Sequence, residues 1–369
     1  MLITRVNIKF SYFLATHHSK MVKKRITSQD VADLAGVSRT TVSFVLNDVK
    51  GFNITSQTRR KVHEAAERLG YIPDASAQAL ATHRTRALGL VMTRSPDHIA
   101  TDAFLPRIIA GLMDVVKDHK LRLLIEYVEM EHQDRAYLAL ARAKRIDGMI
   151  LLTPRVDDAG LRKLEQVDIP TVIMGELAGT NLHSVDIDNR LAAQKGVQYL
   201  LELGHQQIAC ITNASPSYYS SAADRVLGYK YALNAAGITP NEELIRYADF
   251  DPRSGYNQMK SLLDGQKNFT AVFVASDNVA MGAYAALRDS GLRIPEDVSV
   301  VGFDDIPWAE YAEPSLTTVR LEAQELARRA CLVLTDLLEG VEIPTKRQIL
   351  KTELVVRKSC AISPILERG

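Results

Sequence analysis

The sequence has little of what disulfide-bonded proteins, membrane proteins and most enzymes carry. Its three cysteines, Cys210, Cys331 and Cys360, lie far apart in 369 residues, so we expect neither a disulfide framework nor a metal site. No apolar run approaches the roughly 20 residues that span a bilayer. Phosphate-binding glycine loops, nucleophile elbows and HExxH helices are missing. We therefore expect a protein of the reducing cytoplasm that is not an enzyme and has no cofactor, metal or membrane partner.

Charge is distributed unevenly, although the chain as a whole carries only +1. Between Val22 and Arg86 there are eleven basic and six acidic side chains, which gives this segment +5, whereas residues 87–369 carry −7. A basic segment on an acidic body favours local attraction to phosphate groups. The length is suited to two or three domains.

Residues 1–21 contain basic and aromatic side chains, which leaves two interpretations open. A signal peptide needs an unbroken apolar stretch and a small-residue cleavage site. Here Lys9, Ser11 and Tyr12 interrupt the apolar stretch and no such cleavage site follows. We expect residues 1–22 to form a disordered extension, with Met21 as a candidate for the natural start.

Two short helices joined by a tight turn are predicted within Thr27–Asn47. Thr27 and Asp30 have the spacing of a capping box, Gly36 supplies the turn, and Ser38 caps the second helix. The apolar residues that would pack between the two helices are Val31, Leu34, Ala35, Val42, Val45 and Leu46. The side chains left facing outward on the second helix are Arg39, Thr40, Ser43, Phe44 and Asn47. A short helix with this polar face suits the major groove of DNA.

A third helix is predicted to begin at Thr55 or Ser56 and to end at Gly70, which completes a three-helix domain over residues 26–73. Pro73 cannot continue it. The next segment, Asp74–Ala81, is alanine-rich and too short to stay helical alone in water. It is therefore either a flexible linker or a switch that becomes helical only when something packs on it, within a hinge and linker spanning residues 74–86.

From Ala87 onward, short apolar strands alternate with amphipathic helices in two series of similar length, with QIACIT among the predicted strands and a turn expected at VDIDN. Repeated βαβ units indicate parallel sheets that are covered by helices on both faces, so the fold class is α/β with two doubly wound lobes. Ligands of such sheets bind at the carboxyl ends of the strands. The candidate ligand contacts in the loops that follow strands are Phe104, Arg225, Asp277, Asp304 and Trp308.

These five side chains combine directed hydrogen bonding with flat apolar faces, which suits a sugar but also a purine that stacks. Each of them has another interpretation. Asp277 could cap a helix, Phe104 could be ordinary core packing, and Trp308 could anchor a lobe surface. Arg225 and Asp304 could instead serve in a salt bridge.

The run DVADLAGVSRTTVSFVLN resembles the helix-turn-helix of the lactose-repressor/galactose-repressor family of bacterial regulators. The likeness continues through TSQTRRKVHEAAERLGYIPDASAQALA and, more loosely, to about residue 358. It implies a helix-turn-helix head, a hinge helix and a two-lobed core of the periplasmic-binding-protein type-I kind over residues 87–358. Lobe one would comprise about 87–187 and 318–345, lobe two about 188–317 and 346–358, with residues 359–369 as a tail.

The resemblance also implies roles for single residues. Arg39, Thr40 and Phe44 would read bases, whereas Ser38, Thr41 and Asn47 would contact phosphates unless they serve as local caps. Ala77 and Leu80 would enter the minor groove. Arg225 and Asp304 match positions that hold the effector. Two residues depart from the family pattern: many members have Arg in place of Phe44, and some sugar-binding members have an acidic residue in place of Gly175. Phe44 could also pack beneath the second helix.

We therefore expect a cytoplasmic homodimeric repressor of carbohydrate-utilisation genes that binds a near-palindromic double-stranded operator and responds to a small sugar. Alternatives are a regulator of this family that responds to a purine or another metabolite, a transport-type sugar-binding protein, and an enzyme with a fused DNA-binding head. The basic head and the absence of a cleavage site count against the second, and the missing phosphate-binding loop counts against the third.

Overall fold

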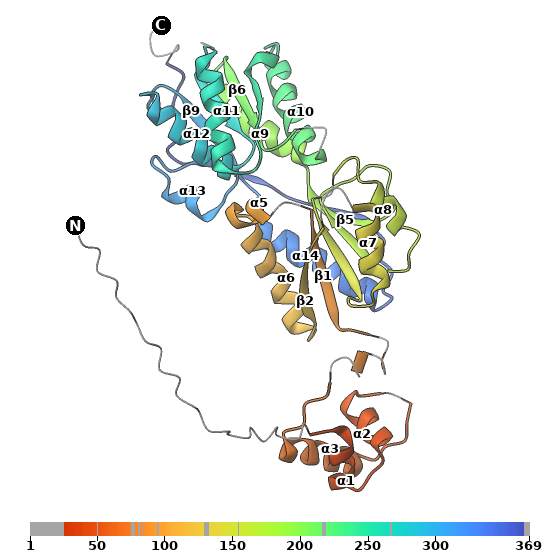
Figure 1. Cartoon of the computed structure of the whole chain (residues 1–369). Helices are drawn as coiled ribbons and strands as arrows, with labels where there is room; N and C mark the ends of the chain where they lie inside the picture. Colours follow the sequence, from red (N-terminus) through yellow and green to blue (C-terminus); the bar gives the residue numbers. More distant parts are fainter. Residues whose placement is uncertain are drawn as a thin grey trace, which may run out of the picture. The chain divides into compact units, whose positions relative to one another are not determined.

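The structure is a computed structural model that describes residues 26–49, 51–74, 78–79, 82, 84–93, 96–128, 133–153, 155–215, 219–265 and 268–364. The chain divides into two compact units, Met1–His83 and Arg84–Gly369 (Figure 1). Within the described ranges, no helix is both long enough and apolar enough to cross a membrane.

The described residues of the first unit include three helices, α1 (Ser28–Ala35), α2 (Arg39–Leu46) and α3 (Ser56–Leu69). The predicted capping box at Thr27 is confirmed, because the Thr27 hydroxyl accepts from the Asp30 amide and the Asp30 carboxylate accepts from the Thr27 amide. Gly36, with φ of 66°, ends α1 in the left-handed conformation that glycine adopts without strain.

The core of the first unit is small and made almost entirely of valine and alanine. Its buried members are Val31, Ala32, Val42, Val45, Val62, Ala65 and Ala66. The expectation that Leu34 packs in this core is wrong, since Leu34 is 44% exposed. At 100° per residue the buried side of α1 lies between Val31 and Ala32, which turns Leu34 toward solvent.

Part of the connecting segment after Pro73 is described. Gln78 and Ala79 are helical, and the Gln78 amide donates to the Asp74 carbonyl at 2.9 Å. Thr82 continues the turn, because its hydroxyl donates to the Gln78 carbonyl at 2.8 Å. Ala77 and Leu80 lie outside the described residues, so their role in the minor groove stays a prediction.

The second unit contains two six-stranded sheets. The first, which we call lobe one with its helices, has the order β11-β5-β4-β3-β1-β2 and is parallel throughout. Its strands are β1 (Ala87–Met92), β2 (Arg122–Tyr127), β3 (Gly148–Leu152), β4 (Thr171–Met174), β5 (His183–Ile187) and β11 (Arg347–Leu350).

The second sheet, in lobe two, has the order β12-β10-β9-β8-β6-β7, and only β12 is antiparallel to its neighbour. Its strands are β6 (Ile208–Thr212), β7 (Ile245–Tyr247), β8 (Ala271–Val274), β9 (Ser299–Asp304), β10 (Thr317–Arg320) and β12 (Glu353–Val355). The predicted two-lobed α/β fold is therefore confirmed.

Helices cover both faces of each sheet (Figure 1). In lobe one, α6 and α14 pack on one face and α7 and α8 on the other, and in lobe two α9 and α10 lie opposite α11 and α12. These helices are α6 (Leu105–Asp118), α7 (Gln133–Arg142), α8 (Ala159–Leu164), α9 (Asn189–Glu202), α10 (Ser220–Ala235), α11 (Pro252–Asp264), α12 (Asp277–Asp289) and α14 (Ala323–Leu338). Two shorter helices, α5 (Pro96–Thr101) and α13 (Pro307–Tyr311), lie near the junction of the lobes.

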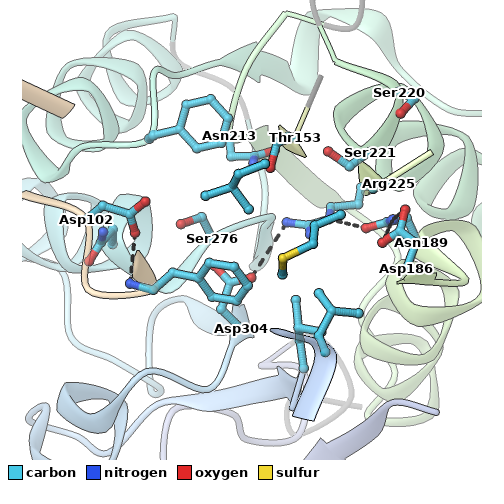
Figure 2. Close-up of a pocket in the computed structure, with 18 of the residues that line it drawn as sticks. Asp102, Thr153, Asp186, Asn189, Asn213, Ser220, Ser221, Arg225, Ser276 and Asp304 are labelled. Carbon is cyan, nitrogen blue, oxygen red and sulfur yellow. Dashed lines mark hydrogen bonds and ion pairs between the residues drawn. The ribbon is translucent and has the colours of Figure 1, made fainter. Parts of the chain in front are cut away.

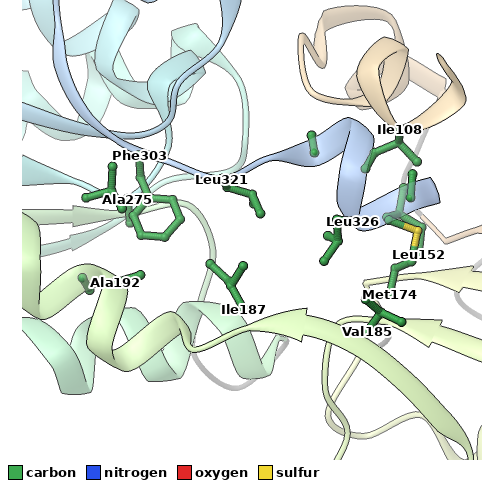
Figure 3. Close-up of a cluster of buried hydrophobic side chains, with 14 of the residues drawn as sticks. Ile108, Leu152, Met174, Val185, Ile187, Ala192, Ala275, Phe303, Leu321 and Leu326 are labelled. Carbon is green, nitrogen blue, oxygen red and sulfur yellow. The ribbon is translucent and has the colours of Figure 1, made fainter. Parts of the chain in front are cut away.

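One apolar cluster runs through the junction between the lobes (Figure 3). Ala275 and Phe303 belong to lobe two and Met174 and Val185 to lobe one, and Leu321 lies on the segment that joins β10 to α14. All these side chains are buried. The continuous apolar contact holds the strand ends of the two lobes near each other and so positions what those ends carry.

The structure places the changes of lobe later than the resemblance implied. Strand β10 pairs with β9 in lobe two, so the chain enters lobe one after Arg320 rather than near residue 318. Strand β11 pairs with β5 in lobe one, so the return to lobe two falls after Leu350 rather than at 346. The reason is burial: Thr317, Thr318 and Val319 are enclosed between β9 and β12, where they complete the second sheet.

Candidate functional site

A cavity of about 760 Å³, part of it open to solvent, lies between the lobes at the carboxyl ends of the strands (Figure 2). Both lobes contribute to its wall, as expected for a ligand site in open parallel sheets. The polar residues that line it are Asp102, Thr153, Glu176, Asp186, Asn189, Asn213, Ser220, Ser221, Arg225, Ser276, Asn278 and Asp304. The apolar residues are Phe104, Leu152, Met174, Phe250, Ile306, Leu321 and Leu326, and Gly175 completes the wall.

Arg225 on α10 is held from several sides and is only 6% exposed. Its Nε donates to Asn189 Oδ1 at 3.0 Å and its Nη1 donates to the Ala275 carbonyl at 2.7 Å. The guanidinium carbon lies 3.8 Å from the centre of the Phe303 ring, which is a cation–π contact. These contacts fix a buried positive charge at the cavity wall.

Asp186 on β5 is the most buried of the carboxyl groups in the wall, with 7% of its surface exposed. It accepts hydrogen bonds from the Ile187 amide at 2.8 Å and from Asn189 Nδ2 at 3.3 and 3.4 Å. Burial raises the pKa of Asp186 to about 6, while the Ile187 amide and the charge of Arg225 act in the opposite direction. Figure 2 shows Asp186, Asn189 and Arg225 grouped on one side of the cavity.

Asp304 and Asp305 follow one another at the end of β9, and their carboxylates have different surroundings. Asp304 lines the cavity, with its Oδ1 at 3.9 Å from Arg225 Nη1. Asp305 accepts from Arg320 Nε and Arg357 Nη2, both at 2.7 Å. Their φ angles of 107° and 53° lie in the region that non-glycine residues avoid, and such strain persists only where surrounding contacts maintain it.

Two of the five predicted ligand contacts do not line the cavity. Asp277 is completely buried at the start of α12, where its carboxylate accepts from the Ile306 amide at 2.9 Å and from Thr318 Oγ1 at 2.7 Å. Burial, and next the charge of Asp304, raise the pKa of Asp277 well above its usual range. Trp308 on α13 is 63% exposed and lies on the lobe surface. Ser276, the N-cap residue just before Asp277, lines the cavity instead.

The structure adds wall residues that the sequence did not single out. Phe250 follows the three-residue strand β7, which was not predicted. Asp186 lies within β5 and Asn189 begins α9 just after it, in a stretch where only a turn was expected. Asn213 could have been found, because it directly follows the predicted strand QIACIT. Asp102, in the loop after α5, and Asn278, in the first turn of α12, carry no strand signal of their own.

Several hydrogen bonds between described residues connect the lobes around the cavity. Asn278 Nδ2 donates to the Thr101 carbonyl at 3.1 Å, and Ser220 Oγ donates to the Glu176 carbonyl at 2.6 Å. Arg107 on α6 donates from Nη1 to the Asp305 carbonyl at 2.9 Å. The lobes are thus in contact on more than one side of the cavity.

The lining of the cavity is acidic. Among the wall residues that the structure describes, four are carboxylic acids (Asp102, Glu176, Asp186 and Asp304) and one, Arg225, is cationic. An anion placed here would meet net repulsion, whereas hydroxyl and amide groups would find acceptors. No group of three or more His, Cys, Asp or Glu side chains in the described ranges is placed to hold a metal ion.

On the head, the residues predicted to contact phosphates have local partners. Ser38 Oγ accepts from the Thr41 amide at 3.1 Å and lies 2.9 Å from Thr41 Oγ1, so both act in the cap of α2. Asn47 Nδ2 donates to Ser43 Oγ at 3.1 Å. Hydroxyl and amide groups held in this way can still contact a phosphate, and that role stays a prediction.

The residues predicted to read bases lie outside the core of the head. Arg39 and Thr40 are exposed at the start of α2, and Arg39 Nε donates to Ser28 Oγ at 3.1 Å. Phe44 does not pack beneath α2. Its ring stacks on that of Phe52 from the following loop, with 3.9 Å between ring centres.

Comparison with known proteins agrees with both units. The description "Bacterial regulatory proteins, lacI family" matches residues 27–74, and "Periplasmic binding protein-like domain" matches residues 197–360. The solved structure of the transcriptional regulator CelR–cellobiose complex is 34% identical, has a TM-score of 0.70, and covers 91% of this chain and 100% of its own. The lac repressor dimer bound to operator and the anti-inducer ONPF is 30% identical, has a TM-score of 0.80, and covers 92% and 100%.

Curated relatives extend over nearly the whole chain. The HTH-type transcriptional regulator CelR of Thermobifida fusca is 35% identical over 343 residues, which is 91% of this chain and 99% of that protein. The HTH-type transcriptional repressor CytR of Escherichia coli (strain K12) is 33% identical over 350 residues, covering 94% and 99%. The repressor PurR of Klebsiella pneumoniae is 34% identical over 349 residues, covering 92% and 98%. Head, core and relatives agree, and the chain belongs to the lacI family of bacterial regulatory proteins.

Proposed function

We propose that this transcriptional regulator is a repressor of carbohydrate-utilisation genes whose affinity for its operator is set by a neutral sugar bound between the lobes. The observation that carries this proposal is the composition of the cavity wall. Carboxylate, amide and hydroxyl groups line it together with apolar side chains, among them the rings of Phe104 and Phe250. A sugar ring has hydroxyls at its rim and apolar C–H faces, so it matches both kinds of surface.

The charges of the wall narrow the class of sugar. Asp186 and Asp304 can each accept hydrogen bonds from hydroxyls, and Arg225 can donate to ring or hydroxyl oxygens. A sugar phosphate or sugar acid would bring an anion among four carboxyl groups and one guanidinium, which is unfavourable in a cavity of low dielectric. The binding of cellobiose, a neutral sugar, by the related CelR supports this assignment.

A purine is the second candidate effector. Phe104 and Phe250 could stack on a base, and the amides of Asn189 and Asn213 could pair with its edge. PurR and CytR are among the relatives at similar identity. We place the purine second because the acidic wall offers more acceptors than a purine has donors.

We further propose that the protein acts as a homodimer on a near-palindromic operator. A single head of this kind reads one half-site, so two heads are needed for a full site. Lobe one has exposed apolar side chains on α6 and on its edge strand β2, namely Met113, Leu124, Ile125 and Tyr127. An edge strand with apolar residues invites pairing, and burial of this surface in a dimer would protect it.

The hydrogen bonds between the lobes suggest how a ligand is sensed. Asn278 lines the cavity and also donates to the Thr101 carbonyl, and Ser220 lines it and donates to the Glu176 carbonyl. A ligand that engages these residues changes the balance between closed and open lobes. Since Arg84 donates to the Leu338 carbonyl on lobe one, that change can reach the segment that leads to the head.

Two measurements test the proposal. Operator DNA is selected from random duplexes with the full-length protein, and binding is then titrated at several salt concentrations, because specific binding exceeds salt-dependent nonspecific binding. Neutral mono- and disaccharides, their phosphorylated and acidic forms, and purines are next screened by thermal shift. Failure to select any duplex would refute the DNA-binding function. Stabilisation by anionic sugars or by purines alone would refute the neutral-sugar assignment.

A further inference from the structure

The stacked rings of Phe44 and Phe52 form an apolar surface on the outside of the head. The ring centres are 3.9 Å apart and the ring planes differ by 20°. Phe44 belongs to α2, whereas Phe52 belongs to the loop between α2 and α3 and is 50% exposed. Neither ring is a member of the apolar core of the head. We call this pair the ring platform.

The loop holds Phe52 against α2 through its backbone. The Val49 amide donates to the Phe44 carbonyl at 3.0 Å, so the loop begins by folding back on the helix end. Gly51 then adopts φ of 96°, which a glycine does without strain, and the Ile54 amide donates to the Phe52 carbonyl at 2.8 Å. Ile54 itself packs on the core of the head. The platform is therefore anchored on both sides.

The platform lies on the side of α2 that is turned away from the core. Val42 and Val45 are buried, and at 100° per residue Thr40 and Phe44 fall on the opposite side, one turn apart. Thr40 is exposed there. This is the side of the second helix that helix-turn-helix domains insert into the major groove.

Within the major groove few groups can pair with two phenylalanine rings. The rings have no hydrogen-bond donor or acceptor, so they cannot read the polar edges of guanine, adenine or cytosine. The thymine C5-methyl group is the apolar feature of the groove. We propose that the ring platform contacts the C5-methyl group of one thymine in each operator half-site, an inference that rests on the proposed DNA-binding function.

Alternatively, the ring platform only supports the loop between α2 and α3 and does not contact DNA. Removing methyl groups from the DNA distinguishes this structural role from reading of a thymine methyl group. In the selected operator, each thymine is replaced in turn by uracil, which lacks only the C5-methyl group. We expect one position per half-site at which uracil weakens binding about fourfold, the factor that burial of one methyl group provides. At that position, 5-methylcytosine should bind more tightly than cytosine by a similar factor.

Variants of the full-length protein connect the effect to the rings. In Phe44→Ala, uracil and thymine operators should bind equally at the identified position, while discrimination at the base pair read by Arg39 is kept. Phe52→Leu should reduce the methyl preference, because Phe44 loses its support. Tyr71→Phe, which alters an aromatic residue packed against the head core, is the control and should leave the preference unchanged.

The outcomes separate this inference from the proposed function. If a duplex is selected but no uracil substitution matters, or if Phe44→Ala still prefers thymine, the ring platform does not read a methyl group and DNA binding stands. A platform that only braces the loop gives that result, together with a lowered thermal stability of the head in both variants. If no duplex is selected, both the function and this inference fail.

Discussion

Arg225 and Asp304 come from different elements of lobe two, yet their charges lie 3.9 Å apart at the cavity wall. On its other side Arg225 bonds to Asn189, which in turn donates to Asp186 on lobe one. A row of polar groups thus runs from the end of β9 in lobe two to β5 in lobe one. A ligand in the cavity would meet this row from both lobes at once.

Removal of the buried guanidinium should destabilise the core. Arg225→Met leaves Asp304 and Asp186 without their shared cation, and breaking a buried pair in this way costs about 3–5 kcal/mol in the free energy of unfolding. Urea unfolding followed by tryptophan fluorescence measures the loss. Arg190→Met is the matched control, because the side chain of Arg190 is 57% exposed and its Nη2 lies 3.6 Å from Asp224 Oδ1. Loss of this exposed pair should lower the free energy of unfolding by less than about 1 kcal/mol. Equal losses for the two variants would contradict the buried-charge account.

Stability should depend on pH through Asp186. Burial raises the pKa of Asp186 to about 6 in the folded state, above its unfolded value of 3.8, so the folded state binds more protons between these pH values. The contribution of this group to stability is therefore fully present below about pH 4 and is lost as pH rises through 6. The loss corresponds to about 3 kcal/mol at 1.36 kcal/mol per pKa unit.

Asp186→Asn should remove that penalty. We expect the variant to exceed the wild type in the free energy of unfolding by up to about 3 kcal/mol at pH 7.5 and by much less at pH 4.5. Denaturant unfolding at the two pH values measures the difference. Asp188→Asn serves as the control for loss of one carboxylate, since Asp188 is exposed and Asn also caps helices such as α9. A gain that is the same at both pH values would show that desolvation of Asp186 is not the cause.

The effector contacts of Asp304 can be tested without disturbing the head. Asp304→Ala should leave operator affinity in the absence of sugar within about twofold and should weaken binding of the sugar found by the screen, by about 1.5–3 kcal/mol if a charge-assisted hydrogen bond is lost. Calorimetry gives the sugar affinity and a gel-shift titration gives the operator affinity. Unchanged sugar affinity would remove Asp304 from the set of ligand contacts.

The sequence was informative about the fold because the alternation of apolar strands and amphipathic helices is a local signal. The short strands carried too little of this signal. β7 has only three residues, so Phe250, which follows it, was missed. A turn was expected in place of β5, so Asp186, which lies within β5, was missed as well. The sequence does not show to which lobe β10 and β11 belong. Each strand joins the sheet of the strand it pairs with, β9 for β10 and β5 for β11, and these partners lie far away in the chain.

For the cavity, the position of a residue just after a strand predicted that it lies near the cavity but not whether its side chain faces it. Phe104, Arg225 and Asp304 reach the wall, whereas Asp277 turns to the Ile306 amide and Thr318. Ser276 and Asp277 are neighbours in the chain, yet only Ser276 faces the cavity. Which of two neighbouring side chains does so is set by the surrounding packing, which the sequence does not display.

Base reading by Arg39 predicts a loss of selectivity at one position. Arg39→Ala should lose about 1–3 kcal/mol of discrimination at a single base pair of the half-site, because a bidentate contact to guanine is removed. Binding to a panel of operators that each carry one substituted base pair measures it. Arg60→Ala, exposed on α3, is the comparison for a phosphate contact and should weaken binding to all operators alike. Uniform weakening by Arg39→Ala would indicate a phosphate contact.

Closure of the lobes should depend on Arg107, which does not line the cavity. Arg107 donates to the Asp305 carbonyl at 2.9 Å, and the side chain of Asp305 is in turn held by Arg320 and Arg357 near the segments that connect the lobes. Arg107→Met keeps the apolar stem of the side chain and removes the donor. The closed form should lose about 1–2 kcal/mol, so the sugar found by the screen should bind roughly 5- to 30-fold more weakly although none of its contacts has changed. Calorimetry measures the sugar affinity of Arg107→Met. Arg328→Met is the control, because Arg328 pairs with Glu325 within α14. Equal sugar affinity in the two variants would show that the contact from Arg107 to Asp305 has no part in closure.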